Sequence, residues 1–162
     1  MNRITKSFTY SEYDDSAELT PEEQDIIRIS FKAAQFAYAP YSGFYVGAAV
    51  LLDNGNVIKG NNQENAAYPS GLCAERVAVY SASALYPQIA IKAIAISSSS
   101  KEITAGKFVT PCGSCRQALI EYEKKQKSPI KLLLSGQKGK IITINSISDL
   151  LPLHFNYVNL IK

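Results

Sequence analysis

Apolar side chains recur at helical spacing in three stretches of the chain. In the first, Ile27, Phe31, Ala34 and Tyr38 follow one another at steps of four, three and four, which places them on one helical face. Thr20 precedes this face and is a typical helix cap. Proline at position 40 marks the expected end of the helix. The pattern predicts helices over residues 20–39, 73–85 and 112–125.

Between these helices the apolar residues form short runs rich in β-branched side chains, which are typical of strands. A hairpin is expected where Asp53-Asn54-Gly55 separates two such runs, and the continuous apolar run at 89–98 is typical of a strand covered on both faces. The last two strands are joined by only a few residues, so they must run antiparallel if they are neighbours. The expected strands are residues 44–52, 57–59, 89–98, 130–134 and 140–144.

This order of elements predicts an α/β fold, a three-layer α/β/α sandwich with a mixed five-stranded sheet. Residues 1–19 show no clear period, so we expect a tail, followed by a single catalytic domain over residues 20–162. A further short helical turn is expected at residues 147–151.

Composition excludes several classes of protein. Charged residues make up 19% of the 162 residues and the net charge is +3, which is too small to argue by itself for nucleic acid. The longest apolar stretch is interrupted by Lys92 and is far shorter than the roughly 20 residues that cross a bilayer. We expect no membrane association and a cytoplasmic protein without a disulfide framework, because the three cysteines cannot all pair within one chain.

The three cysteines have the spacing of a metal site. Cys112 and Cys115 lie in the first turn of one expected helix, and Cys73 starts another. Three thiolates leave the fourth position of a tetrahedral Zn²⁺ open, which is typical of a catalytic site rather than a structural one. We therefore expect one Zn²⁺ per subunit.

Two charged residues beside Cys73 suit hydrolytic chemistry. Glu75 lies two positions after a ligand, where a carboxylate accepts and passes on the proton of an activated water. Three thiolates give the zinc site a net negative charge, which an adjacent cation offsets. Arg76 and Arg116 each lie next to a ligand in the sequence, and Arg76 is the preferred candidate for this role.

Less specific interpretations exist for the same residues. The Cys112 and Cys115 pair also occurs as a redox pair, as buried cysteines or as part of a structural zinc knuckle. His154 is more typical of a packing residue than of a metal ligand. Lysines at 124, 125, 127 and 131 resemble a nucleic-acid patch but also suit the C-terminus of a helix.

The cysteine motifs resemble those of the zinc nucleoside deaminases. They are Cys73-Ala74-Glu75 and Pro111-Cys112-Gly113-Ser114-Cys115-Arg116. Further segments are similar to the small homotetrameric cytidine deaminases, namely Tyr38-Ala39-Pro40-Tyr41-Ser42-Gly43-Phe44, Asn62-Gln63-Glu64-Asn65-Ala66-Ala67 and Leu150-Leu151-Pro152-Leu153-His154-Phe155.

The resemblance implies a hydrolase that acts on the C–N bond of a cyclic amidine. Cytidine and deoxycytidine would become uridine and deoxyuridine plus ammonia, a reaction of pyrimidine salvage. Zinc would activate the water that attacks C4 while Glu75 protonates N3. By the same resemblance the following residues bind the nucleoside: Phe44 on the pyrimidine, Asn62 and Glu64 on the ribose, Ala74 on the base, and Phe155 on a base in a neighbouring subunit of a homotetramer with shared active sites.

Two other functions remain open at this point. One is a deaminase of a cytosine-containing antibiotic nucleoside. Asn62 and Glu64 argue against it, because they favour a substrate with a plain ribose. The other is an RNA-binding or editing module on the same fold. In the polynucleotide deaminases that it would resemble, the last two strands run parallel, so the short link at 135–139 argues against this function.

Overall fold

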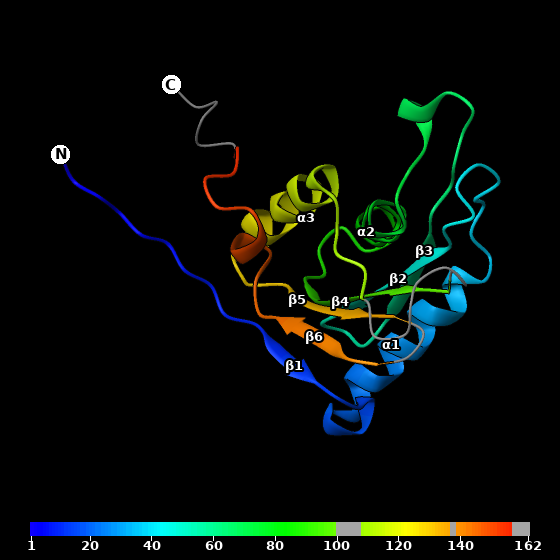
Figure 1. The fold of residues 1–162 in the computed structure, drawn as a ribbon, viewed down its shortest axis with the longest axis horizontal. Coiled ribbons are helices and arrows are strands. Elements are labelled where there is room, and N and C mark those ends of the chain that lie inside the picture. Colours follow the sequence, from blue (N-terminus) through cyan, green and yellow to red (C-terminus); the bar gives the residue numbers. More distant parts are fainter. Residues whose placement is uncertain (100–107, 137–138, 157–162) are drawn as a thin grey trace.

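The computed structural model describes residues 1–99, 108–136 and 139–156 (Figure 1). Its helices are α1 (Pro21–Ala34), α2 (Ala74–Leu85) and α3 (Gly113–Gln126), with short 3₁₀ turns η1 (Ser16–Glu18), η2 (Tyr68–Ser70) and η3 (Ile147–Leu150). Its strands are β1 (Ser11–Tyr13), β2 (Val46–Leu52), β3 (Val57–Asn61), β4 (Ile91–Ser98), β5 (Lys131–Ser135) and β6 (Ile141–Ile144).

The strands form one mixed sheet in the order β1-β6-β5-β4-β2-β3. β4 and β5 are parallel and are connected through α3. The β2–β3 hairpin and the β5–β6 pair are antiparallel, which confirms both expectations for these strands. Residues 137 and 138 of the link between β5 and β6 lie outside the described residues.

Helices cover both faces of the sheet, as the three-layer prediction requires. α1 packs on one face, and α2 and α3 lie on the other (Figure 1). The core is correspondingly divided into two apolar clusters, one around Ile26 and Leu133 and the other around Ile96 and Leu132. Neighbouring strand residues face opposite sides of a sheet, so Leu132 and Leu133 belong to different clusters.

The sheet has one strand more than predicted. Residues 1–19 are not a featureless tail, because Ser11–Tyr13 pairs antiparallel with β6 along the edge of the sheet. Tyr13 and Leu19 then pack against the α1 side of the core. The five-strand count was one short because this strand is formed by tertiary pairing, and its local pattern is too brief to identify it.

α1 ends earlier than predicted. Its last residue is Ala34, and the amide groups of the next three residues bond to carbonyls three positions back. Tyr38, expected on the helical face, instead forms a β-bridge with Gln63. This bridge draws the chain away from the helix axis and toward the loop after β3.

Glu123 joins α3 to the segment after β6. Its carboxylate is buried and accepts hydrogen bonds from the amides of Ile130 and Ile147 at 2.9 and 2.7 Å. The side chains of Ser146 and Ser148 donate to the same carboxylate. Burial by itself raises the pKa of Glu123, but these donors outweigh it and hold the pKa below 4.5.

Close helix packing brings α1 and α2 near the sheet. A Cβ on Gly47 would lie 2.0 Å from the carbonyl oxygen of Ser30 in α1, and one on Gly60 would lie 2.4 Å from the amide of Ala78 in α2. Glycine is therefore required at both contacts. Within the described part of the chain, no helix has the length and hydropathy of a membrane span.

Candidate active site and metal centre

Two helix N-termini bring the three cysteines together. Cys73 is the N-cap of α2 and Cys112 the N-cap of α3, while Cys115 is buried one turn into α3. The Sγ atoms of Cys73 and Cys112 are 4.0 Å apart, and all three sulfurs lie within 4.8 Å of one another. Residues separated by 39 positions in the sequence thus form one cluster.

This cluster fits a single Zn²⁺. Tetrahedral zinc with Zn–S bonds of about 2.3 Å places its sulfur ligands about 3.8 Å apart, close to the Cys73–Cys112 separation of 4.0 Å. Three thiolates would hold the ion and leave one coordination position for a water or a substrate atom. The predicted metal ligands Cys73, Cys112 and Cys115 are therefore assembled as one zinc site in each chain.

The thiols of Cys73 and Cys115 differ in pKa. The Cys115 thiol donates a hydrogen bond to Cys73, and Arg76 adds a second donor and a positive charge; together these lower the pKa of Cys73 to about 5. The same hydrogen bond, together with burial, raises the pKa of Cys115. Cys73 therefore ionises more readily than Cys115 before a metal binds, and metal binding displaces the remaining thiol protons.

Glu75 projects from the first turn of α2 into the pocket that contains Cys73. Its side chain is buried, and this desolvation raises its pKa to about 7. A Zn²⁺ held by the cysteines would add positive charge nearby and lower that pKa again. A carboxyl group balanced in this way can both accept and donate a proton near neutral pH.

Arg76 lies beside the sulfurs, as the sequence predicted. Its Nη2 atom is 3.9 Å from the Sγ of Cys73, and one helical turn separates the two residues. Arg116, the other arginine next to a ligand, instead donates to the carbonyls of Pro111 and Leu150. Of the two, only Arg76 is placed to offset the charge of the thiolates.

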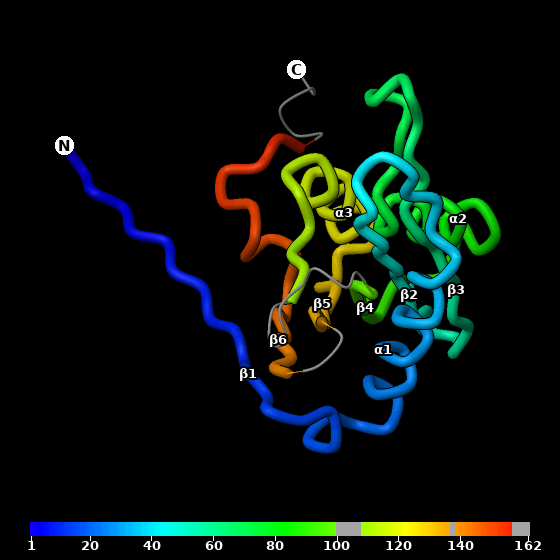
Figure 2. Tube along the Cα trace, turned by 45° about the vertical axis from the view of Figure 1, so that its right-hand side comes forward, coloured from blue at the N-terminus to red at the C-terminus, as the bar shows by residue number. Residues whose placement is uncertain are grey.

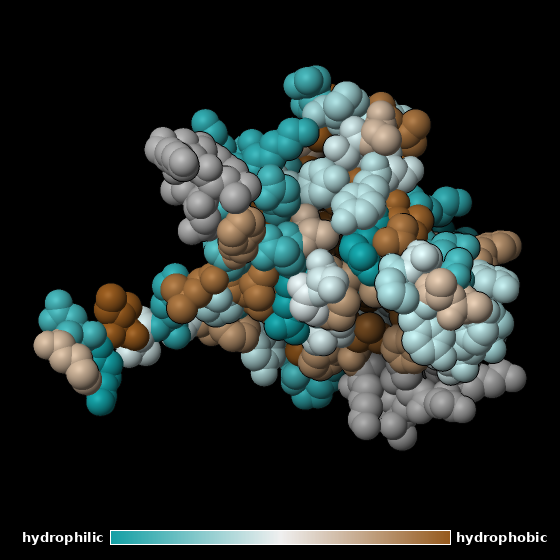
Figure 3. All heavy atoms as spheres, turned by 90° about the horizontal axis from the view of Figure 1, so that it is seen from above, coloured by the Kyte–Doolittle hydropathy of each residue, from teal (hydrophilic) through white to brown (hydrophobic). Residues whose placement is uncertain are grey.

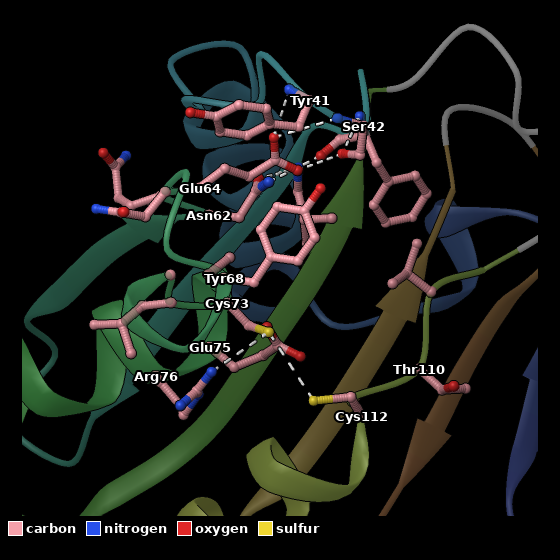
Figure 4. A pocket seen from close by; sticks show the side chains of 18 residues that line it. Tyr41, Ser42, Asn62, Glu64, Tyr68, Cys73, Glu75, Arg76, Thr110 and Cys112 are labelled. Atoms are coloured by element: carbon pink, nitrogen blue, oxygen red, sulfur yellow. Dashed lines mark hydrogen bonds between the residues drawn. The ribbon is translucent and has the colours of Figure 1, made fainter.

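A pocket of about 630 Å³ opens in front of this centre. Figure 4 shows Cys73, Glu75, Arg76 and Cys112 gathered at one end of it. Asn62, Glu64, Ser42, Tyr41 and Tyr68 lie at the other end. The pocket therefore has a metal and proton-transfer end and a polar end that carries a carboxylate.

Backbone bridges hold the polar end in place. Gln63 forms a β-bridge with Tyr38 on one side and with Leu72 on the other. These bridges bring the segment between α1 and β2 next to the loop that leads to Cys73. The amide of Tyr38 donates to the carbonyl of Asn62, and the amide of Glu64 donates to the carbonyl of Tyr38. These contacts place residues 62–64 at the rim of the pocket.

Glu64 accepts several hydrogen bonds at that rim. The hydroxyl of Ser42 donates to one carboxylate oxygen, and the amides of Tyr41 and Ser42 donate to the other at 2.9 and 3.3 Å. The Ser42 hydroxyl is the main cause that lowers the pKa of Glu64. Glu64 is consequently an oriented, ionised acceptor that lines the pocket.

The other predicted nucleoside contacts separate into two groups. Phe44, Asn62 and Ala74 line the pocket, and both ends of the Asn62 amide bond to the backbone, with Val46 donating to Oδ1 and Nδ2 donating to Phe44. Phe155 does not line the pocket of its own chain. The residue is 57% exposed, and its carbonyl accepts a hydrogen bond from the side chain of Gln117 in α3.

Several pocket residues were not assigned a role from the sequence. The rings of Tyr41 and Tyr68 meet edge to face with centroids 6.2 Å apart, and Thr110 enters from the irregular segment just before α3. Ser42 lies in the segment 38–44 that resembles the cytidine deaminases, and the sequence pattern predicts no role for its hydroxyl. The signal that the sequence offers for Ser42 is its position two residues before Phe44, the aromatic residue expected on the pyrimidine.

Comparisons with known proteins agree with this geometry. Residues 20–128 match the family model described as the cytidine and deoxycytidylate deaminase zinc-binding region. The chain belongs to this deaminase family. The match contains all three cysteines, Glu75 and Arg76.

Other deaminases of the family are similar over most of the chain. The cytidine deaminase of Halalkalibacterium halodurans is 38% identical over 131 residues, which cover 81% of this chain and 92% of the relative. That of Sporosarcina psychrophila is 37% identical and covers 80% and 88%. The crystal structure of the cytidine deaminase from Burkholderia pseudomallei superposes with a TM-score of 0.69 at 38% identity and covers 81% and 97%.

Proposed function

We propose that this protein hydrolyses cytidine and deoxycytidine to uridine and deoxyuridine with release of ammonia, as an enzyme of pyrimidine salvage. One observation carries the proposal: the pocket joins a three-cysteine metal site and a buried Glu75 at one end to an oriented Glu64 at the other. Its volume of about 630 Å³ is in the range of small-molecule sites. The cytidine deaminases that match the chain support the same reaction.

Zn²⁺ bound to Cys73, Cys112 and Cys115 would supply the Lewis acidity that makes a water nucleophilic near neutral pH. Glu75 accepts a proton from that water while the water oxygen forms a bond to C4 of the pyrimidine. Glu75 passes this proton to N3. Glu75 then carries the remaining proton of the former water oxygen to the exocyclic amino group, and the C4–N bond breaks to release ammonia and leave a carbonyl at C4. The buried position of Glu75 keeps bulk water from competing for these protons.

The walls of the pocket position the nucleoside for these transfers. Phe44 offers a partly exposed ring at the pocket surface, suited to packing on a pyrimidine. Ala74 is the first residue of α2, where helix amides have no partner within the helix, and its backbone would bond the base. Asn62 and Glu64 would hold the ribose 3′-hydroxyl, with Glu64 as the acceptor.

A homotetramer with shared active sites accounts for Phe155. Its ring is exposed and lies outside its own pocket, which supports a role against a base bound in a neighbouring subunit. Three cysteines kept as metal ligands also require reducing conditions, which supports a cytoplasmic location. Nothing in the proposal requires a nucleic acid or a membrane as partner.

The two alternative functions receive less support. An RNA-binding or editing module is disfavoured by the antiparallel pairing of β5 and β6 and by an acidic Glu64 at the pocket rim, since a carboxylate there repels phosphate groups. A deaminase of an antibiotic nucleoside would have the same metal end of the pocket but different residues at the polar end. The Ser42–Glu64 arrangement instead suits an unmodified ribose hydroxyl.

Loss of the cytidine absorbance band, followed with purified zinc-loaded protein, tests the proposal. We expect wild-type turnover of cytidine and deoxycytidine, and a decrease of about 10²- to 10⁴-fold for Glu75→Gln at unchanged zinc content. Glu121→Gln is the matched control, because Glu121 is exposed on α3. Equal turnover by wild type and Glu75→Gln would remove Glu75 from the mechanism.

A further inference from the structure

Residues 1–10 form an extended arm that leaves the body of the molecule. The arm continues from the start of β1, and both views of the backbone show it running away from the sheet (Figures 1 and 2). Apolar atoms are distributed along it in the space-filling view (Figure 3). Ile4 is 84% exposed, and Phe8 and Tyr10 are 50% and 56% exposed.

The apolar and aromatic side chains of the arm share one face of an extended chain. Ile4, Phe8 and Tyr10 occupy even positions together with Asn2 and Lys6, and the odd positions after Met1 hold Arg3, Thr5, Ser7 and Thr9. Alternate residues of an extended chain share a face. The rings of Phe8 and Tyr10 accordingly lie next to each other, with centroids 6.5 Å apart.

The arm has no strand partner in the described part of its own chain. β1 is the edge strand of the sheet, and its pairing with β6 begins at Ser11, opposite Thr143. β6 ends at Ile144, and the chain then turns into η3. Within the described residues, β6 therefore does not extend far enough to pair with residues before Ser11. The arm and the outer edge of β1 therefore form one continuous unpaired edge, which is a template for adding another strand.

We propose that this edge pairs antiparallel with the same edge of a second copy of the chain, with Thr9 of each copy facing the other across a two-fold axis. In this register Lys6 faces Glu12 of the other copy, and Phe8 faces Tyr10. The pairs repeat on both sides of the axis, so a single two-fold contact satisfies each of them twice.

Charge complementarity identifies the second copy as the occupant. Basic residues lie in the first half of this edge and acidic residues in the second half, so antiparallel self-pairing places opposite charges across from each other and parallel pairing does not. Lys140 of the same chain contacts one carboxylate oxygen of Glu12, and the carboxylate has a second oxygen that can accept from Lys6. The aromatic pairs on the same face add cross-strand packing.

This pairing joins the two sheets through β1 and is separate from the deaminase chemistry. The arm precedes the region that matches the deaminase family model, which begins at residue 20. The pairing therefore uses residues outside the region that the family model matches.

Cysteine cross-linking tests the register directly. Facing residues of an antiparallel pair have Cα atoms about 4.5–5.5 Å apart, within the range that a disulfide spans. We expect Thr9→Cys in the zinc-loaded full-length protein to give a disulfide-linked dimer on a non-reducing gel. Thr5→Cys is the control, because its two copies would lie roughly 26 Å apart, and it should stay at the wild-type background.

Mixing of charge variants provides an independent test. Lys6→Glu and Glu12→Lys should each weaken self-association measured by sedimentation over a concentration series, since each variant places like charges opposite each other. An equimolar mixture of the two variants should recover association, because unlike charges then face across the mixed contact. Equal cross-linking of Thr9→Cys and Thr5→Cys, or a mixture that associates no better than its components, would overturn the proposal.

Discussion

The Nη2 atom of Arg76 lies 3.9 Å from the Sγ of Cys73, so a guanidinium stands next to the thiolates that would hold the metal. Three thiolates around a divalent ion leave a negative charge, which opposes loss of a proton from a bound water. The nearby arginine offsets this charge, and its contribution can be measured.

Arg76→Gln should weaken zinc retention, because it removes the cation without removing a ligand. Changes in residues that support metal ligands typically cost about 10–100-fold in metal affinity or activity. Zinc transfer to a chromophoric chelator measures the effect, and Arg76→Lys is the matched control that keeps the charge. Zinc loss at the same rate from wild type and Arg76→Gln would contradict this role.

Ser42→Ala should raise KM for cytidine by about fivefold, the usual scale for loss of one hydrogen bond, with little change in kcat. Ser42 donates to Glu64, and we propose that Glu64 binds the ribose, far from the reacting carbon. Ser42→Thr retains the hydroxyl and serves as the control. Steady-state kinetics decide the matter: a fall in kcat at constant KM would place Ser42 in the chemical step instead.

Cytidine should be a much better substrate than CMP. Glu64 is held ionised by its hydrogen bonds, and a carboxylate near the ribose repels a 5′-phosphate. Glu64→Gln should lower kcat/KM for cytidine and narrow its advantage over CMP. Parallel assays of both substrates test this, and an unchanged ratio in the variant would argue against the electrostatic explanation.

Glu123→Gln should destabilise the fold by about 3 kcal/mol at neutral pH. The buried carboxylate accepts hydrogen bonds from the amides of Ile130 and Ile147 and from two serine hydroxyls, and an amide cannot accept from all of them. Urea unfolding at a fixed free-zinc concentration measures the difference, with Glu121→Gln as the exposed control. A loss no larger than that of the control would show that these contacts contribute little.

The stability difference between wild type and Glu123→Gln should depend on pH in a defined direction. The pKa of Glu123 is lowered from 4.5 in the folded chain, so the ionised group contributes stability that is fully present above pH 4.5 and is lost as the pH falls through the lowered pKa. We therefore expect a constant gap between pH 6 and 8 that narrows below about pH 4.5. Unfolding curves for both proteins across this range provide the measurement, and a gap that widens in acid would reverse the assignment.

Local patterns in the sequence were sufficient for much of the architecture. Helical spacing identified α1, α2 and α3, and the turn at residues 53–55 identified the β2–β3 hairpin. The shortness of the link after β5 required an antiparallel pair with β6. These features depend on interactions between residues close in the chain, which is why sequence patterns report them.

Elements formed by distant contacts were missed or misplaced. β1 exists because the edge of β6 accepts it, and α1 stops early because Tyr38 pairs with Gln63. The C-terminal segment at 156–160, where the sequence departs from the pattern of the deaminases that it resembles, lies outside the described residues except for Asn156.

At the active site the sequence by itself determined the chemistry that is available: three cysteines, a carboxylate and an arginine at the starts of two helices. Only the tertiary structure decided that the sulfurs lie within 4.8 Å of one another and that Arg76, rather than Arg116, contacts a sulfur. It also placed Ser42 on Glu64 across the rim of the pocket. Ligand identity follows from residue types and local spacing, whereas distances between segments 20 to 40 residues apart depend on how the whole sheet and its helices pack.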